Sequence, residues 1–307
     1  RRKITDCRLR TDVPTNANRP ADRLSRRFLS VTRMPGVSWL SSASRCFPIV
    51  VLTSSTLLAL DADASLALAA RLGDAPGHTI EIHALTRGLG RAFVIGAPDE
   101  FQAALVESDD GPAEPHGFTQ HADILTELLA QVDGWDRVLV DATIVADVER
   151  LVQTQLSLTT RLYESVHLAQ RRAAEGQDDA RVRILAPDDS ALIASSPEDL
   201  QPDGFSSLEE SLHAGIVAGA VQDGRVVAIA YVDSLTQMHG AITIYTDETH
   251  RGQGLATAAA SLVVQQLHRR RVTPVWYTGW DNEGSLRVAQ RLGFEVFDRP
   301  VFVIRHG

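Results

Sequence analysis

The chain has 307 residues, of which 44% are hydrophobic and 22% charged, and its formal net charge is −9. The length suits two modest domains or one large one, and the apolar share excludes a wholly disordered protein. No run of about 18 apolar residues occurs, so we expect no membrane-spanning helix and a cytoplasmic protein. Two cysteines, Cys7 and Cys46, cannot build a disulfide framework and lack metal-ligand spacing, so we expect no metal.

The charge is unevenly distributed along the chain. Residues 1–45 hold eleven basic and three acidic residues, a balance of +8, whereas the rest holds 19 basic and 36 acidic residues, a balance of −17. This composition predicts a basic, disordered tail outside the fold. The alternatives are a transit peptide, a segment at 25–29 that resembles a twin-arginine export signal, an artefact of the gene start, or a nucleic-acid contact. The acidic body argues against nucleic acid as a general partner.

Residues 47–175 are predicted to form a small α/β domain of unknown role. Their patterns predict helices over 62–72, from 98–100 onward, over 122–131 and over 148–171, and strands over 80–82, 92–95 and 137–140. Residues 109–117 are a predicted loop, and residues 175–179 are the clearest linker. The histidines of this part lack metal spacing and are expected to be structural or exposed: His78, His83, His116, His121 and His167.

Residues 181–307 are predicted to form a second domain that begins with an antiparallel meander. Strand 182–185 precedes Asp188 and Asp189, which suit a helix N-terminus, and a short helix over 206–213. Two apolar runs at 216–221 and 226–232 are joined through Asp223-Gly224, a strong hairpin signal. A third strand follows at 241–245.

The segment 246–256 connects this strand to a helix through a glycine-rich turn. Apolar residues from Leu255 onward recur at helical spacing, while Gly252 and Gly254 would let the backbone approach a phosphate at the helix start. A plain strand–helix turn is the alternative. No lysine follows the glycines, as a P-loop requires, and residues 249–280 lack the acid of a dinucleotide fingerprint. This stretch is basic, which suits coenzyme A with its three phosphates.

At this point the sequence resembles the GNAT superfamily of N-acetyltransferases. Residues 251–256 fit the family's pyrophosphate loop, in which Gln or Arg is followed by two residues, Gly, one residue, and Gly or Ala. Residues 282–285, followed by 291–294, are similar to the second family motif, an Asn, a helix, and then Gly-Phe entering a strand. The pair covers residues 182–307, and a weaker resemblance to two-part GNAT proteins extends over the body. The resemblance implies a mixed α/β fold, an α+β arrangement with a mainly antiparallel sheet flanked by helices.

The resemblance also implies an acetyl-CoA-dependent transferase in which an amine attacks the thioester directly. Acetyl-CoA would lie between strands 241–245 and 275–278, which splay apart. The residues expected to hold it are Tyr245, Thr246, Arg251, Gly252, Gln253, Gly254, Leu255, Ala256, Asn282 and Ser285. Asn282 also suits a helix N-cap. An N–H near Tyr245 would stabilise the oxyanion.

The catalytic acid and base are less well specified. Many members carry a Tyr seven residues after the Asn, and Ala289 stands there, so Ser285, Tyr245 or a water is the candidate acid. Glu248 is the candidate base, with Asp233 and His250 as alternatives, or water where proximity supplies the rate. The acceptor would be a small-molecule or peptide amine, without a membrane partner. A non-catalytic acyl-CoA-binding module is the alternative function, and the oligomeric state stays open.

Overall fold

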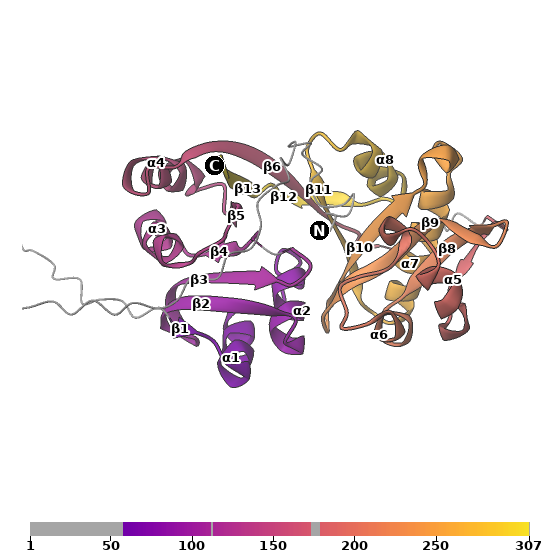
Figure 1. Cartoon of the computed structure of the whole chain (residues 1–307), viewed down its shortest axis with the longest axis horizontal. Helices are drawn as coiled ribbons and strands as arrows, with labels where there is room; N and C mark the ends of the chain where they lie inside the picture. The colour runs from indigo at the N-terminus through magenta and orange to yellow at the C-terminus, as the bar shows by residue number, and fades with distance from the viewer. Residues whose placement is uncertain (1–57, 112, 173–178, 307) are drawn as a thin grey trace, which may run out of the picture. The chain divides into compact units, whose positions relative to one another are not determined.

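The computed structural model describes residues 58–111, 113–172 and 179–306, which belong to one compact unit (Figure 1). The predicted tail, both cysteines and most of the predicted linker lie outside these residues. Within them, thirteen strands join in one mixed, mostly antiparallel sheet flanked by helices, which confirms the predicted fold class. In the same described residues no helix is both long and apolar enough to cross a membrane.

The first part of the described chain alternates helices with short strands. Its elements are β1 (Leu58–Ala59), α1 (Ala62–Leu72), α2 (Thr79–Arg87), β2 (Gly90–Ala97), β3 (Glu100–Ser108), β4 (His116–Phe118), α3 (Ala122–Gln131), β5 (Arg137–Val140) and α4 (Val145–Gln155). The predictions of α1, α3 and β5 are confirmed. Asp61 caps α1 by accepting the Ala64 N–H, and Gly73 ends it at a φ of 74°, because these capping signals are local.

Three predictions in this part are wrong. Residues 80–82 lie inside α2, and Glu100 begins strand β3 rather than a helix. The predicted helix over 148–171 ends as α4 at Gln155; Ser157 then takes a positive φ of 57°, and β6 (Thr159–Ala169) follows. In two of these cases strand pairing overrides a short local pattern: β3 pairs with its neighbour β2, and β6 pairs with the distant strands β11 and β13.

The second part follows its prediction closely. Its elements are β7 (Val182–Ile184), α5 (Ser190–Ala194), α6 (Leu208–His213), β8 (Val217–Gln222), β9 (Arg225–Leu235), β10 (His239–Thr246), α7 (Leu255–Arg269), β11 (Thr273–Gly279), α8 (Glu283–Arg291), β12 (Glu295–Asp298) and β13 (Val301–His306), with single 3-10 turns at 187–189, 198–200 and 248–250. Strands β7 to β10 form the expected antiparallel meander. Helix α7 packs its apolar face on this meander through Ala259, Val263 and Leu267, all fully buried.

Strand pairing crosses the predicted domain boundary in both directions. β6, from before the boundary, pairs with β11, and the C-terminal strand β13 returns to pair with β5 and β6 (Figure 1). The boundary at 175–181 stays a prediction. The two parts nevertheless share one sheet, so residues from both can line the same cavity.

Candidate functional site

The parallel strands β10 and β11 pair over only three residues. His239, Gly240 and Ala241 face Thr273, Pro274 and Val275. Beyond this point the two strands continue to Thr246 and Gly279, where, among the described residues, they pair with their outer neighbours, β9 and β6. An opening therefore lies inside the sheet, and each strand turns backbone N–H and C=O groups toward it. Such groups can pair with the amides of an extended ligand.

The start of α7 has no side-chain cap. Gly252 and Gly254 have φ values of 76° and 83°, which favour glycine, and a Cβ at either would meet nothing within 4 Å. The first intrahelical hydrogen bond runs from the Ala258 N–H to the Gly254 carbonyl. The N–H groups before Ala258 have no partner within the helix, so this end of α7 suits an anion.

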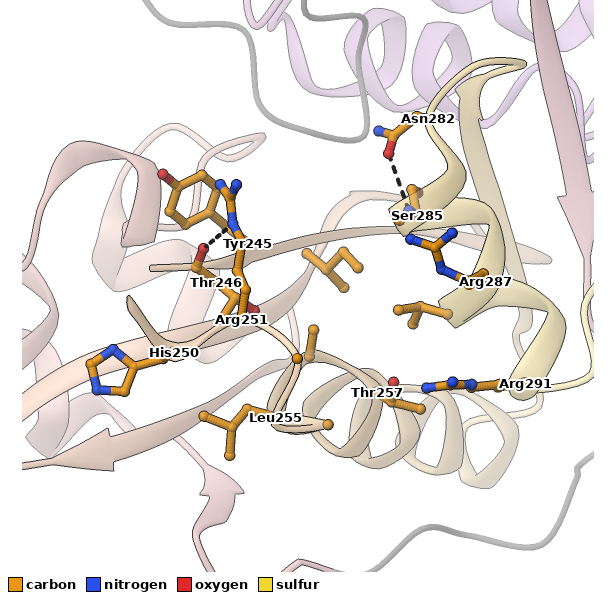
Figure 2. Close-up of a pocket in the computed structure, with 16 residues that line it drawn as sticks. Tyr245, Thr246, His250, Arg251, Leu255, Thr257, Asn282, Ser285, Arg287 and Arg291 are labelled. Carbon is orange, nitrogen blue, oxygen red and sulfur yellow. Dashed lines mark hydrogen bonds between the residues drawn. The ribbon is translucent and has the colours of Figure 1, made fainter. Parts of the chain in front are cut away.

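A cavity of about 450 Å³ joins the opening to this helix start (Figure 2). None of the described residues that line the cavity is acidic. Three of them are arginines: Arg251 from the loop, and Arg287 and Arg291 from α8. Figure 2 shows Arg251 on one side of the hollow and the two α8 arginines on the other. Arg287 also pairs with Glu283 at 3.0 Å on the surface. The arrangement surrounds a helix N-terminus with cations, which favours a ligand carrying several phosphates.

Nine of the ten residues predicted to bind the cofactor line this cavity. They are Tyr245, Thr246, Arg251, Gly252, Gly254, Leu255, Ala256, Asn282 and Ser285. Gln253 is exposed and outside the lining, and its carbonyl accepts a hydrogen bond from Arg181 at 3.1 Å. Arg287 and Arg291 also line the cavity but were not among the predicted cofactor residues. The two arginines follow Asn282 in the chain and are four residues apart. This spacing is the signal that could have found them, because it places both on one face of α8.

Asn282 and Ser285 form the corner where β11 leads into α8. The Asn282 Oδ1 accepts the Ser285 N–H at 3.1 Å, so Asn282 caps the helix as well as lining the cavity. The Ser285 Oγ accepts the indole N–H of the buried Trp276 at 2.8 Å, which leaves the hydroxyl hydrogen as a donor. Ala289 is fully buried in the core between α8 and the sheet.

The predicted base does not face the cavity. The Glu248 side chain is 76% exposed and lies 3.8 Å from Arg251 on the surface. His250 does line the cavity, and its Nδ1 lies 3.4 Å from Asp247 Oδ1. Hydrogen bonds from Thr249 hold the pKa of Asp247 below its usual range. The carboxylates of Asp247 and Glu248 therefore interact with residues of the loop itself.

The basic stretch at 249–280 is divided between two ends of α7. Arg251 and His250 lie at its start, but Arg269, Arg270 and Arg271 lie at its far end, roughly 20 Å away at 1.5 Å per residue. Arg270 donates to the carbonyls of Ala214 and Gly215 instead. The three arginines thus do not contribute to this cavity, and α8 supplies the additional positive charge.

Asp233 is a buried carboxylate on β9, the strand next to β10 on the side away from the opening. It is the extra residue of a bulge in β9, since Ala241 faces Ser234 whereas the next residue, Ile242, faces Val232. Its Oδ2 accepts the Thr243 hydroxyl at 2.6 Å, and its Oδ1 has no hydrogen-bond partner among the described residues. Thr243 belongs to the stretch of β10 that no longer pairs with β11. A buried carboxylate oxygen without a partner is costly and points to a chemical role.

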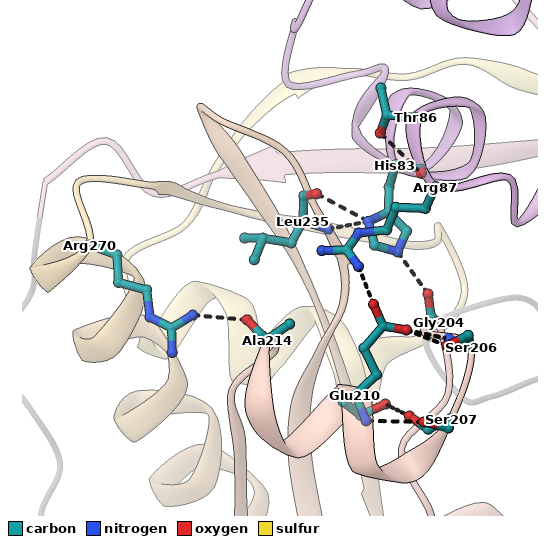
Figure 3. A network of polar contacts seen from close by, with 11 residues as sticks. His83, Thr86, Arg87, Gly204, Ser206, Ser207, Glu210, Ala214, Leu235 and Arg270 are labelled. Carbon is teal, nitrogen blue, oxygen red and sulfur yellow. Dashed lines mark hydrogen bonds and ion pairs between the residues drawn. The ribbon is translucent and has the colours of Figure 1, made fainter. Parts of the chain in front are cut away.

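A histidine holds α2 against this same region (Figure 3). The Nε2 of His83 lies 2.7 Å from the Gly204 carbonyl, and its Nδ1 lies 3.1 Å from the Leu235 nitrogen. Arg87, one turn later, pairs with Glu210 of α6 at 2.5 Å. Gly204 takes a φ of 88° with its Cα against the backbone of Asp233, where a Cβ would come within 1.9 Å of the Asp233 carbonyl. His83 therefore joins three segments distant in sequence around the bulge.

We expect His83→Ala to lower the free energy of unfolding by about 2–4 kcal/mol, because it leaves a buried C=O and a buried N–H unpaired and opens a cavity. Urea unfolding at neutral pH measures the change. His213→Ala, at an exposed position in α6, is the matched control and should stay within about 0.5 kcal/mol. Equal stabilities of the two variants would contradict this structural role.

Within the described residues no group of three or more His, Cys, Asp or Glu side chains could hold a metal ion.

Comparison with known proteins places this site in context. A family model described as GNAT acetyltransferase matches residues 76–299, while the curated proteins searched contain no match. A GCN5-related N-acetyltransferase-like protein from Streptococcus suis is 19% identical with a TM-score of 0.60, covering 80% of this chain and 99% of its own.

Two further solved structures are similar to the chain. An acetyltransferase of the GNAT family from Colwellia psychrerythraea is 12% identical, with a TM-score of 0.52 over 82% of this chain and all 100% of its own. A tandem GNAT protein from the clavulanic acid biosynthesis pathway is 16% identical, with a TM-score of 0.53 over 82% of this chain and 98% of its own. These likenesses show a shared fold, and the family model spans most of the chain. The chain therefore belongs to the GNAT acetyltransferase family.

Proposed function

We propose that the chain is an acetyl-CoA-dependent N-acetyltransferase in which an amine attacks the thioester directly. The observation that carries this proposal is the cavity of about 450 Å³, where an uncapped helix start, two positive-φ glycines and three arginines meet the opening between β10 and β11. A polyphosphate joined to an amide-containing arm matches both halves of this arrangement. The helix start with its glycines and arginines suits phosphates, and the opening between β10 and β11 suits amides.

The residues would divide the binding between them. The backbone of Gly252–Ala256 would receive the pyrophosphate, with Arg251, Arg287 and Arg291 as its counter-charges. The edge of β10 that faces the opening at Tyr245 and Thr246 would pair with the pantetheine arm, and an N–H there would face the developing oxyanion. Acetyl-CoA itself supplies an activated acyl carbonyl.

Proton transfer would rest on Asp233 and Ser285. Asp233 is buried, accepts the Thr243 hydroxyl of β10, and has one oxygen without a partner among the described residues, whereas Glu248 is exposed, so we place the proton acceptor at Asp233. Ser285 lines the cavity, and its hydroxyl accepts from Trp276, which orients the hydroxyl hydrogen as a donor toward a leaving thiolate. We assign Asp233 as base and Ser285 as acid.

A non-catalytic acyl-CoA-binding module is the second candidate. The buried Ala289 favours it, because the Tyr found there in many members is missing. Release of free coenzyme A thiol in the presence of amines separates the two candidates, since a binding module would release none.

Isothermal titration of the full chain with acetyl-CoA tests the proposal. We expect saturable binding at micromolar to millimolar cofactor, competed by coenzyme A. Folded protein that shows no heat of binding at millimolar acetyl-CoA would overturn both candidates together.

Arg291→Gln should weaken acetyl-CoA binding about tenfold, or about 1.4 kcal/mol, because it removes one charge-assisted contact. The loss should shrink at high salt, since Arg291 is exposed and its charge is screened. Arg225→Gln, an exposed arginine at the start of β9, is the control and should bind like the wild type. Equal affinities in titrations of both variants would remove α8 from the binding site.

A further inference from the structure

An arginine that no binding role has yet explained lies against the outer side of the glycine loop. Arg181 directly precedes β7. Its Nη2 donates to the backbone carbonyl of Gln253 at 3.1 Å, and its Nη1 donates to the side-chain Oε1 of the same residue at 3.5 Å. Neither Arg181 nor Gln253 belongs to the described residues that line the cofactor cavity. Arg181 therefore reaches the loop from outside the cavity.

The carbonyl that Arg181 binds belongs to the peptide between Gln253 and Gly254. The described residues contain no cis peptide bond, so the C=O and the N–H of this planar peptide point in opposite directions. Gly254, which carries the N–H, lines the cavity at the start of α7. Because the C=O is held outside, the Gly254 N–H is directed toward the cavity side of the loop.

Glycine leaves the orientation of this peptide free. A peptide can turn over by changing the ψ of the residue before it and the φ of the residue after it. Gly254 takes a φ of 83°, and glycine adopts positive and negative φ about equally readily. The reverse orientation would direct the Gln253 carbonyl oxygen, with its partial negative charge, toward the place of a phosphate. The hydrogen bond from Arg181 supplies the constraint that the glycine lacks.

Asp179 holds the Arg181 guanidinium in place. Its Oδ2 accepts from Nη2 at 2.6 Å and its Oδ1 accepts from Nε at 2.9 Å, the two-point geometry that an arginine and a carboxylate favour. Hydrogen bonds from Arg181 lower the pKa of Asp179 to about 2, so the carboxylate is ionised at neutral pH. Val182, the next residue, is buried and pairs with β8. The guanidinium thus joins the loop to a fixed position at the edge of the sheet.

We propose that Arg181 is a positioning residue for the cofactor: oriented by Asp179, it fixes the Gln253–Gly254 peptide so that the Gly254 N–H faces the pyrophosphate. This role rests on the proposed function. It differs from the role of the three arginines that line the cavity, which would meet the phosphates directly. Arg181 acts through the backbone of the loop, so the geometry of its guanidinium matters more than its charge.

Titration calorimetry of the full chain with acetyl-CoA tests this role. Arg181→Lys keeps the positive charge, but an ammonium lacks the planar fork that binds Asp179 at two points and Gln253 at the same time. We expect the acetyl-CoA Kd to rise about tenfold. The unfolding temperature should stay near that of the wild type, because the Arg181 side chain is 44% exposed and an exposed ion pair contributes little stability.

Arg183→Lys is the matched control for this variant. Arg183 lies two residues later in β7 and also binds a carboxylate at two points, with its Nη2 and Nη1 at 2.6 and 2.7 Å from the two oxygens of Asp189. The remaining hydrogen bond that Arg183 donates goes to the Ile184 carbonyl at 3.2 Å, within its own strand. Arg183→Lys should therefore bind acetyl-CoA with the wild-type Kd.

Asp179→Ala separates positioning from charge by the sign of its effect. If charge alone mattered, removing a negative charge near the cavity would tighten the binding of an anionic cofactor. If Asp179 orients Arg181, the same change weakens acetyl-CoA binding several-fold, and the loss persists at high salt, where direct charge effects are screened. Asp188→Ala, an exposed acid near the start of α5, is the control and should leave the Kd unchanged.

Wild-type affinity in Arg181→Lys, or tighter binding in Asp179→Ala, would overturn the assignment while leaving the cofactor site of the proposed function intact. Equal losses in Arg181→Lys and Arg183→Lys would also overturn it, because they would reveal a general effect of arginines at this edge of the sheet. A wild-type chain that does not bind acetyl-CoA would instead overturn the proposed function, and the role of Arg181 with it.

Discussion

Gly254→Glu is expected to weaken acetyl-CoA binding at least about a hundredfold, or about 3 kcal/mol. Gly254 caps α7 in the left-handed region at a φ of 83°, and its Cα faces the open cavity. A glutamate there puts a negative charge where the pyrophosphate would lie, and it covers the helix N–H groups that would bind it. Titration calorimetry of the folded variant measures the loss.

Gly224→Glu is the matched control for this substitution. Gly224 has a comparable φ of 71° in the turn between β8 and β9, and a Cβ there also meets nothing within 4 Å. Both variants should lose about 1–2 kcal/mol of stability, because a side chain in the left-handed region is strained. Only Gly254→Glu should lose binding; full affinity in that variant would show that phosphate does not bind at this helix start.

Asp233→Asn is expected to lower kcat about 10²–10⁴-fold while the acetyl-CoA Kd stays the same. Asparagine keeps the shape of the side chain and can still accept the Thr243 hydroxyl through its Oδ1, but it cannot take a proton from the amine. The expected range is that of general base catalysis. Thiol release at saturating n-butylamine or putrescine measures kcat, and titration of acetyl-CoA confirms an intact site.

Asp223→Asn serves as the control for this second variant. Asp223 lies in the exposed β8–β9 turn at a φ of 51°, where asparagine is equally well tolerated. Its kinetics should match those of the wild type. An Asp233→Asn variant with wild-type kcat would remove Asp233 from proton transfer and favour an amine deprotonated by water.

Local signals made the glycine loop and the meander predictable. Asp223-Gly224 sets a hairpin by its own conformational preference, and the period of apolar residues changes to that of a helix at Leu255. Eight of the ten predicted cofactor residues lie within one segment, 245–256, so locating the strand and the helix located most of them. Gln253 was the exception, because a residue in the middle of a turn can point either way.

The errors arose where the outcome depends on distant partners. Residues 159–169 carry apolar side chains compatible with a helix, but β11 and β13, more than a hundred residues later, take them as a strand. Glu248 was the predicted base and Asp233 an alternative, and because each follows a predicted strand the local pattern does not show which of them is buried. Their burial differs because Asp233 sits in a bulge between β10 and the loop at Gly204, and pairing register is not a local property.

By itself, the sequence determined the glycine loop, the order of strands around it and the family resemblance, because each depends on residues adjacent in the chain. The uneven charge that it also displayed was only partly informative. Arg269–Arg271 lie at the far end of α7, away from the cavity, and it is Arg287 and Arg291 of α8 that line the cavity instead. The tertiary structure alone decided which carboxylates are buried and which arginines line the cavity. These properties depend on long-range pairing between β6, β11 and β13 and on the docking of α2, which bring together residues separated by more than a hundred positions.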